Sequence, residues 1–316
     1  MMDMVAYAER LPRAGETIHG RSFSLGFGGK GANQAVMCSL LGAEVSMVAC
    51  IGTDLFGDLT LENFAGFSVR TEAISRIPDV SSGVAPIWVD DSGSNRIIII
   101  GGANDHMSVE DVDAGLRLAG ETDVILCQLE IPVECVERAF THAQSVGSIA
   151  VLNPAPMVQI EPHVLKLADW IIPNETELRE LAGLVLAEPA DSVEAAAQAV
   201  VEELGSNLVI TLGEQGALLS QQGVEAVERV DAPVVEAIDT TGAGDAFVGA
   251  FCYELALGAH PQTAARMASA CAASSVTRRG TQSSFPRELE LGELKATYLD
   301  AVGQAVAASP ESEVTT

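Results

Sequence analysis

The feature that most constrains the fold is an alternation of short apolar runs with helical segments, which begins near residue 110. Parallel strands need crossover connections, usually helices, and helices on both faces of a sheet leave its strands almost wholly apolar. The alternation therefore predicts an α/β fold with a parallel sheet. Four runs are predicted to be strands of this sheet: Asp123–Gln128, Ser148–Asn153, Trp170–Pro173 and Leu208–Leu212.

Polar residues and glycines follow these runs, at the carboxyl ends of the predicted strands. Ligands of open α/β sheets bind beyond those ends. We therefore expect one edge of the sheet to hold a site. The residues that the rule selects are Glu130, Asn153, Asn174 with Glu175 and Glu177, and Gly213 with Gly216.

The segment Asp239–Asp245 has the sequence Asp-Thr-Thr-Gly-Ala-Gly-Asp and opens a long helical pattern. A helix start presents unpaired N–H groups and roughly half a positive charge, so backbone alone can hold a transferring phosphoryl group. Gly242, Ala243 and Gly244 would supply that backbone, and Asp245 is placed like a general base for an attacking alcohol. The alternative is an Asp that caps an ordinary helix, which does not explain the preceding glycines and threonines.

A second glycine-rich segment, Gly28–Ala35, leads into another predicted helix. Its glycines allow close approach to a ligand, and Lys30 and Asn33 offer hydrogen bonds to hydroxyl groups. The chain has only two other lysines, Lys166 and Lys295, so Lys30 is not expected to be incidental surface charge. A dinucleotide-binding loop is excluded because the segment lacks the Gly-x-Gly-x-x-Gly spacing after a strand.

Two pairs of extended segments flank this loop and predict a small four-stranded sheet. One pair is Met4–Ala8 with Ser22–Gly26, and the other is Val84–Val89 with Arg96–Ile100, split by a turn at 90–95. A hairpin of this size is too small to be stable alone, so we expect the pairs to form a lid on the larger domain.

Both glycine-rich segments match signatures of one protein family. Asp-Thr-Thr-Gly-Ala-Gly-Asp-Ala-Phe resembles the C-terminal signature of the ribokinase-like (PfkB) family of sugar and nucleoside kinases, and Gly-Gly-Lys-Gly-Ala-Asn-Gln-Ala resembles the N-terminal one. The resemblance covers nearly the whole chain. It implies a three-layer Rossmann-like parallel sheet flanked by helices over residues 1–306, with lid strands at about 4–26 and 84–100.

The resemblance also implies an activity, the ATP-dependent phosphorylation of D-ribose at its 5-hydroxyl, with Mg²⁺ and K⁺. Another family substrate, such as deoxyribose, fructose or adenosine, stays open, as does a sugar-binding relic without turnover. The implied partners are the sugar, ATP and a second copy of the chain that pairs through the lid.

Site residues carry over from the family position by position. The sugar would be bound by Asp3, Gly29, Lys30, Asn33, Glu130 and Asp245. The nucleotide would be bound by Asn174, Thr211, Leu212, Gly213, Glu214, Gln215, Gly216, Gly244, Asp245 and Ser269. Potassium would be bound by Asp239, Thr241, Ser275, Arg278, Gly280 and Ser284, and magnesium by Glu177 through water. From the residues alone, Asn174–Glu177 also fits an ordinary first turn of a helix.

The N-terminus departs from the family pattern. Family members begin with a buried strand and a Ser-x-Asn-x-Asp turn, whereas here Asp3 matches the turn's Asp and Met1 stands at its Asn. The resemblance thus implies that the first core strand of the sheet is missing. Losing a central strand would expose two strand edges and part of the core, which favours a start codon assigned too late over a genuinely shortened protein.

Composition excludes several other classes. A formal net charge of −27 disfavours nucleic acid and anionic membranes as partners. No apolar run reaches the ~18 residues of a membrane span, so we expect a cytoplasmic protein. The six cysteines lack metal-ligand spacing and are expected to be reduced core residues. The polar tail 307–316 is expected to be disordered.

Overall fold

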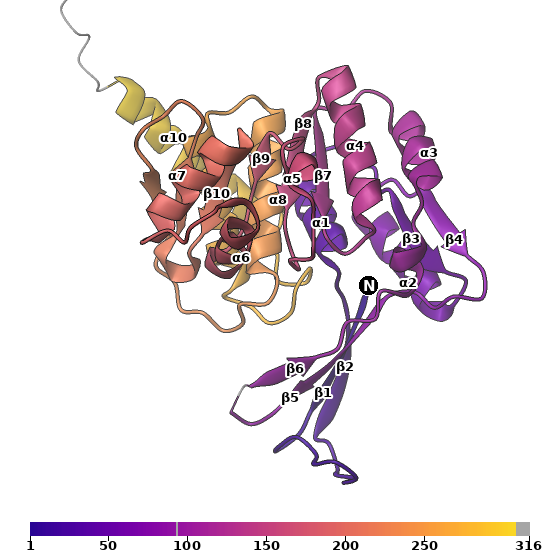
Figure 1. Cartoon of the computed structure of the whole chain (residues 1–316). Coiled ribbons are helices and arrows are strands. Elements are labelled where there is room, and N and C mark those ends of the chain that lie inside the picture. Colours follow the sequence, from indigo (N-terminus) through magenta and orange to yellow (C-terminus); the bar gives the residue numbers. More distant parts are fainter. Residues whose placement is uncertain (93, 308–316) are drawn as a thin grey trace, which may run out of the picture.

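The core is a sheet between two layers of helices, as seen in the computed structural model, which describes residues 1–92 and 94–307 (Figure 1). Six strands lie in the order β12-β11-β10-β9-β8-β7. Their bounds are β7 Val124–Gln128, β8 Ile149–Asn153, β9 Trp170–Ile171, β10 Asn207–Thr211, β11 Ala217–Ser220 and β12 Glu228–Val230. The predicted parallel sheet is confirmed for β7 to β10, and β11 and β12 add antiparallel strands that the sequence analysis did not identify.

Alternating side chains of the strands explain the layers, because successive residues of a strand point to opposite faces. Ala150 and Leu152 of β8 pack into one core cluster with α3, α4, α6 and α7, whereas Val151 joins a second cluster with α1, α8 and α9. The helices are α1 Lys30–Leu41, α2 Leu55–Gly66, α3 Val109–Ala119, α4 Val133–Val146, α5 Pro162–Leu165, α6 Glu175–Val185, α7 Val193–Leu204, α8 Ala243–Ala256, α9 Pro261–Ser275 and α10 Glu288–Ala307.

A separate parallel pair of strands, β3 Ala49–Gly52 and β4 Ile74–Ile77, lies beyond the β7 edge of the main sheet. Ahead of β3, Ser46 forms an isolated bridge with Arg70. The short 3-10 helix Gly102–His106 contacts this pair. The sheet is thus divided into two pieces in the described part of the chain.

The predicted lid is confirmed as a four-stranded sheet in the order β2-β1-β5-β6, which projects from the body at the bottom of Figure 1. Its strands are β1 Met2–Tyr7, β2 Ser22–Phe27, β5 Val84–Val89 and β6 Asn95–Ile97. β1 pairs antiparallel with β2 and parallel with β5. One end of the lid begins beside the N-terminal end of α1, so the lid lies next to the glycine-rich loop.

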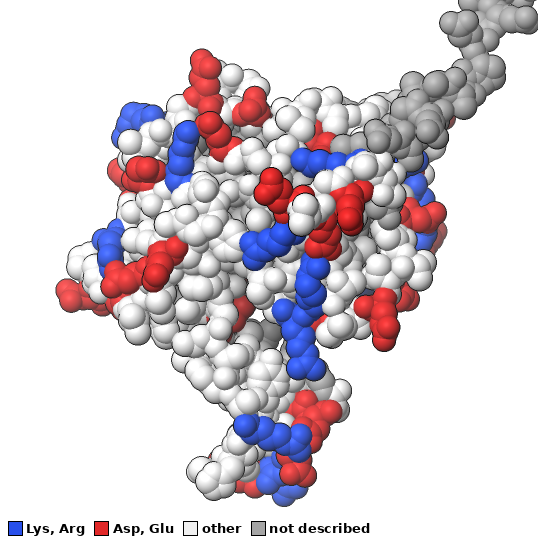
Figure 2. Space-filling view, turned by 180° about the vertical axis from the view of Figure 1, so that it is seen from behind, with Lys and Arg blue, Asp and Glu red and all other residues white. Residues whose placement is uncertain are grey.

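Charged side chains are spread over the surface. On the face shown in Figure 2, acidic and basic residues are interspersed over the body and the lid. None of the described helices is both long and apolar enough to cross a bilayer. The helix α10 ends at Ala307, so the expected disordered tail lies outside the described residues except for that first position.

Candidate active site

Asp245 lies in the first turn of α8, where the chain enters the helix through Gly242. Gly242 has φ of 78°, in the left-handed region that favours glycine. The Asp245 side chain is only 8% exposed, yet both of its oxygens accept hydrogen bonds from amide groups of α1. Asn33 Nδ2 lies 2.8 Å from Oδ2, and Gln34 Nε2 lies 2.9 Å from Oδ1. The carboxylate is therefore held in one orientation.

A chain of side-chain amides fixes these two donors in turn. Gln34 Nε2 also donates to Asn153 Oδ1 at 2.9 Å, and Gln128 Nε2 donates to Gln34 Oε1 at 2.5 Å. On the other side, Gln282 Nε2 donates to Asn33 Oδ1 at 2.9 Å. No role for these glutamines was predicted from the sequence, and Asn153 was predicted only to lie at a strand end. The signal for Gln34, Gln128 and Asn153 was an amide inside or at the end of an otherwise apolar segment, because a buried amide needs a partner. Gln282 lies in a polar loop and gave no such signal.

The surroundings of Asp245 act on its pKa in opposite directions. Burial raises the pKa of the carboxyl, whereas the Lys30 charge and the hydrogen bonds from Asn33 and Gln34 lower it, with a net rise. A carboxylate whose pKa is raised is a stronger proton acceptor. The predicted position of a general base thus has the geometry and the environment that this role requires.

Two further carboxylates lie near Asp245, and both were predicted to bind sugar. The Glu130 carboxylate accepts the backbone N–H of Lys30 at 2.8 Å, and burial raises its pKa. Burial also raises the pKa of Asp3 to about 6, with smaller contributions from Glu130 and Asp245. A Cβ on Gly28 would lie 2.3 Å from Asp3 Oδ1, so only glycine fits beside this carboxylate.

The predicted sugar-binding residues are therefore brought together around the start of α1. Gly29, with φ of 87°, is the residue before this helix, and Asn33 donates its backbone N–H to the Gly29 carbonyl. The Lys30 charge lowers the pKa of both Glu130 and Asp245, so it acts on both carboxylates. Hydroxyl groups of a small polyol match this mixture of carboxylate acceptors and ammonium and amide donors.

The turn before Asp245 presents unpaired backbone donors. Across residues 1–92 and 94–307, the N–H groups of Gly242, Gly244 and Asp245 have no hydrogen-bond acceptor, whereas Ala243 donates to Thr240 O at 3.2 Å. A Cβ on Gly244 would meet no atom within 4 Å, so this side of the turn is open. An anion could bind here through backbone alone. Ala243 would have to release Thr240 to take part, and its role stays a prediction.

The predicted potassium residues lie on two segments that contact each other. Asp239 accepts from the Gly280 N–H at 3.0 Å and from the Thr241 hydroxyl at 2.7 Å. Burial opposes ionisation of Asp239, but these hydrogen bonds outweigh it and lower its pKa. A Cβ on Gly242 would lie 2.4 Å from Thr281 Cγ2, so the turn before Asp245 packs directly on the later loop. The donor set is made of oxygen atoms, which suits a hard cation.

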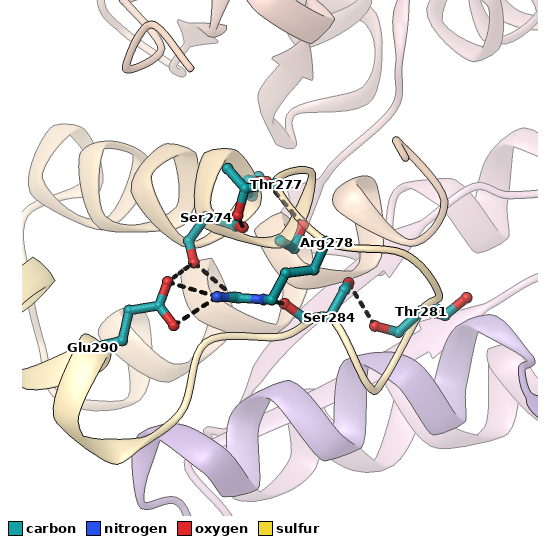
Figure 3. Close-up of polar contacts among 8 residues, drawn as sticks. Ser274, Thr277, Arg278, Thr281, Ser284 and Glu290 are labelled. Atoms are coloured by element: carbon teal, nitrogen blue, oxygen red, sulfur yellow. Dashed lines mark hydrogen bonds and ion pairs between the residues drawn. The ribbon is translucent and has the colours of Figure 1, made fainter. Parts of the chain in front are cut away.

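Arg278 links this later loop to α10 (Figure 3). Its guanidinium donates to the Ser284 carbonyl at 2.7 Å and pairs with Glu290 at 3.0 Å, and Ser274 bonds both side chains. The Ser284 hydroxyl donates to Thr281 O at 2.8 Å, which leaves its lone pairs available. Arg278 therefore braces the loop with its side chain, so only its carbonyl could meet a cation. Ser275 is 1% exposed, and its hydroxyl donates to Ala272 O.

Seven of the predicted nucleotide-binding residues, Asn174 and Thr211–Gly216, lie at the carboxyl ends of β9 and β10, where Asn174 forms a bridge with Thr211. Gly244 and Asp245 lie in α8. Leu212 donates to the Gly216 carbonyl at 2.8 Å and closes a turn that holds Gly213, Glu214 and Gln215. Gly216 has φ of 88°, and a Cβ there would lie 2.0 Å from Val230 O. The turn itself therefore requires glycine at this position, without reference to a ligand.

Asn174 and Glu177 form a reciprocal capping box at the start of α6. Asn174 Oδ1 accepts the Glu177 N–H at 2.9 Å, and Glu177 Oε2 accepts the Asn174 N–H at 2.8 Å. These residues therefore do form the ordinary first turn of a helix that the sequence also allowed. Burial raises the pKa of Glu177, with a contribution from Asp245, so the two carboxylates lie within electrostatic reach. Glu177 Oε1 stays outside the capping box and fits a magnesium-bound water.

Ser269 was predicted to contact the nucleotide, and it lies inside α9 with 4% of its surface exposed. Its hydroxyl has no hydrogen-bond partner among the described residues. The structure does not bring Ser269 to an open surface, and its predicted contact remains untested.

Comparison with known proteins places this site in a family. The sequence profile of the pfkB family carbohydrate kinases matches residues 1–288, and the chain belongs to this family. It is therefore a kinase, a phosphotransferase with an alcohol group as acceptor.

Relatives that match this chain include sugar kinases of the ribokinase type. Deoxyribokinase of Salmonella typhi is 39% identical over 287 residues, which cover 90% of this chain and 93% of that protein. Ribokinase of Mus musculus is 37% identical over 296 residues, which cover 92% and 91%. A relative named for deoxyribose and one named for ribose thus both match nearly the full length of this chain.

Solved structures agree with this assignment. The ribokinase of Thermotoga maritima has a TM-score of 0.83 at 35% identity, covering 93% of this chain and 95% of that one. The Arabidopsis thaliana ribokinase, solved in complex with ribose and ATP, has a TM-score of 0.82 at 31% identity with the same coverage. The ribokinase-like fold predicted from the sequence is confirmed.

Proposed function

We propose that this kinase transfers the γ-phosphoryl group of ATP to the 5-hydroxyl of D-ribose and gives D-ribose 5-phosphate and ADP. The observation that carries the proposal is the buried Asp245, held by two amides of α1 at the open start of α8. The Arabidopsis relative was solved with ribose and ATP, which supports these two substrates for a chain with the same fold.

Asp3, Lys30, Asn33 and Glu130 bind the hydroxyl groups of the sugar and direct its primary alcohol toward Asp245. Asp245 Oδ accepts the proton of that alcohol as its oxygen attacks the phosphorus. The free N–H groups of Gly242 and Gly244 stabilise the charge that develops on the transferring phosphoryl oxygens. Closure of the lid excludes water, which protects ATP from hydrolysis.

Two cations complete the proposal. Glu177 would hold magnesium through water, and Mg²⁺ neutralises phosphate charge when bound. Asp239, Thr241, Ser275, Arg278, Gly280 and Ser284 would hold potassium, chiefly through carbonyl oxygens. Because the turn at Gly242 packs on Thr281, a cation between the two segments would order the anion-binding amides. Potassium is then expected to raise kcat, and equal rates in potassium, sodium and a bulky organic cation would contradict the site.

2-Deoxy-D-ribose is the second candidate acceptor, favoured by the 39% identity to a deoxyribokinase. A site that hydrogen-bonds the 2-hydroxyl leaves buried polar groups unpaired when that hydroxyl is missing, and it rejects such a substrate strongly. Steady-state kinetics with both sugars test the choice. A kcat/KM for ribose at least ~10-fold above that for deoxyribose supports the proposal, and the reverse order assigns the chain to deoxyribose.

The lid also suggests a partner. Its strands and the segment after β6 expose large apolar side chains, namely Phe23, Leu25, Ile97, Ile98, Ile99 and Ile100, each 46% to 59% exposed. Large apolar side chains that are exposed on one small sheet favour an interaction site there. We propose that a second copy of the chain covers it. Sedimentation of the parent and of Ile98→Asp tests this, and a monomeric parent contradicts it.

A further inference from the structure

Gln282 is a buried polar residue that the proposed mechanism does not use. It lies in the loop after α9, and only 4% of its surface is exposed. Its side-chain amide is paired at both ends, because Nε2 donates to Asn33 Oδ1 at 2.9 Å and Oε1 accepts from Asn63 Nδ2 at 2.8 Å. Gln282 therefore links α2, which carries Asn63, to the start of α1, which carries Asn33.

These three side chains form an amide chain, Asn63–Gln282–Asn33, in which every donor points the same way. The last donor is Asn33 Nδ2, which lies 2.8 Å from Asp245 Oδ2. The oxygen and the nitrogen of an amide have nearly the same size, so hydrogen-bond partners decide which of them faces a neighbour. Because Gln282 occupies Oδ1 of Asn33, the nitrogen of Asn33 is the end that faces the carboxylate.

The other oxygen of Asp245 is held separately. Gln34 Nε2 donates to Oδ1 at 2.9 Å, and Gln34 is paired in turn with Gln128 and Asn153. Without the bond from Asn33, the carboxylate would be held at one oxygen and could rotate about its terminal bond, which has no sharp preferred angle. Proton transfer needs a base in a fixed position. The amide chain therefore affects the group that is proposed to accept the proton.

The loop that carries Gln282 also packs on the turn before α8. A Cβ on Gly242 would lie 2.4 Å from Thr281 Cγ2, and the Ser284 hydroxyl donates to the Thr281 carbonyl at 2.8 Å (Figure 3). The backbone beside Gln282 is thus held in place. A side chain supported in this way can fix the orientation of its partner.

We propose that Gln282 is a positioning residue for phosphoryl transfer, which acts on Asp245 through Asn33 and is itself directed by Asn63. The inference rests on the proposed function, in which Asp245 accepts the proton of the attacking alcohol. Replacing Gln282 should therefore lower the rate of transfer and leave the dissociation constant of ATP unchanged. Asn33 also belongs to the proposed sugar site, so the rates are compared at saturating ribose.

The experiment measures single-turnover transfer in Gln282→Met and Asn63→Ala, each alone and combined with Asp245→Asn. Methionine keeps the length of glutamine and removes both hydrogen bonds. We expect Gln282→Met to lower the rate by ~10-fold or more, the effect of losing a hydrogen bond to a charged group, and Asn63→Ala to lower it less. In the Asp245→Asn background neither change should lower the remaining rate further, because the base through which they act is absent.

Ser283→Ala is the matched control in the same loop. Its side chain is exposed and takes no part in the amide chain, so this variant should keep the parent rate. An unchanged rate in Gln282→Met, or an equal fall in Ser283→Ala, overturns the proposal. A fall of the same size in the Asp245→Asn background also overturns it, because Gln282 would then act without the base. If Gln282→Met does not fold, Asn63→Ala, at a partly exposed position of α2, is judged by the same comparisons.

A measurement without substrate separates this proposal from the proposed function. NMR follows the exchange with water of the side-chain amide hydrogens of Asn33 in the parent and in Gln282→Met. We expect exchange to be ~10-fold faster in the variant, because Asn33 loses the bond to its oxygen and can turn. Equal exchange rates overturn the proposal. A parent that phosphorylates neither ribose nor deoxyribose contradicts the proposed function, and the exchange rates then decide the role of Gln282 by themselves.

Discussion

The glycines before Asp245 allow a test that separates ligand binding from folding. Gly244 lies in the first turn of α8, and an added Cβ would meet no atom within 4 Å. Alanine favours a helix over glycine by roughly 0.5–1 kcal/mol, so Gly244→Ala is expected to leave the free energy of unfolding unchanged or slightly raised. If the open side of this turn receives the phosphoryl group, the new methyl group occupies the place of a phosphate oxygen. We expect kcat to fall by ~10²-fold or more, because the displaced phosphoryl group can no longer bond the backbone N–H groups of the turn.

Gly242→Ala is the matched variant. Its residue would need φ near 78°, and its Cβ would lie 2.4 Å from Thr281 Cγ2. The left-handed conformation alone costs alanine about 1–2 kcal/mol, so this variant should lose stability together with activity. Urea unfolding and a coupled assay of ADP release measure both quantities. A Gly244→Ala enzyme that keeps its kcat within a few-fold would refute the assignment of this turn to the phosphoryl group.

Three further changes test other parts of the account. Asp3→Asn removes a carboxyl whose folded pKa of about 6 exceeds its ordinary value of 3.8. The parent should therefore lose more stability than the variant as pH rises from 4 to 6, by at most about 3 kcal/mol in urea unfolding. Identical pH profiles would contradict it. Lys30→Met should weaken ribose binding by about 1.5–3 kcal/mol with the ATP dissociation constant unchanged in calorimetry, and an unchanged ribose affinity would place the sugar elsewhere. Glu290→Gln breaks a partly exposed ion pair with Arg278, so it should lower the free energy of unfolding by about 1 kcal/mol or less. It should also raise the potassium concentration that gives half-maximal kcat. An unaltered potassium response would show that this ion pair does not position the loop.

Much of the fold could be predicted because its signals are local. The apolar runs that became β7 and β8 are bounded by polar residues and match the observed strands within a residue. β11 and β12 were missed, since Ala217–Ser220 is short and Glu228–Val230 carries two charged residues among its three. Their assignment depends on antiparallel pairing with β10, a tertiary contact that no local pattern encodes.

The candidate site was predicted only in part, for a related reason. The positions of Asp245, Asn33 and Glu130 follow from two motifs and one strand end, and the structure brings them together. The amides of Gln128 and Gln282 reach the same carboxylate network from segments 154 residues apart in the chain, and their roles appear only after folding. Glu177 shows the converse, because one short motif serves both as a helix cap and as a candidate magnesium position.

The most direct test of the central claim is the single-turnover rate of Asp245→Asn, measured together with the dissociation constants of ribose and ATP. Asparagine keeps the size of the side chain but cannot accept the proton of the attacking alcohol. The account predicts a fall in the phosphoryl-transfer rate of at least ~10²-fold, with both substrates still bound. A variant that binds both substrates and transfers phosphoryl within a few-fold of the parent rate would contradict the role of Asp245 as the general base.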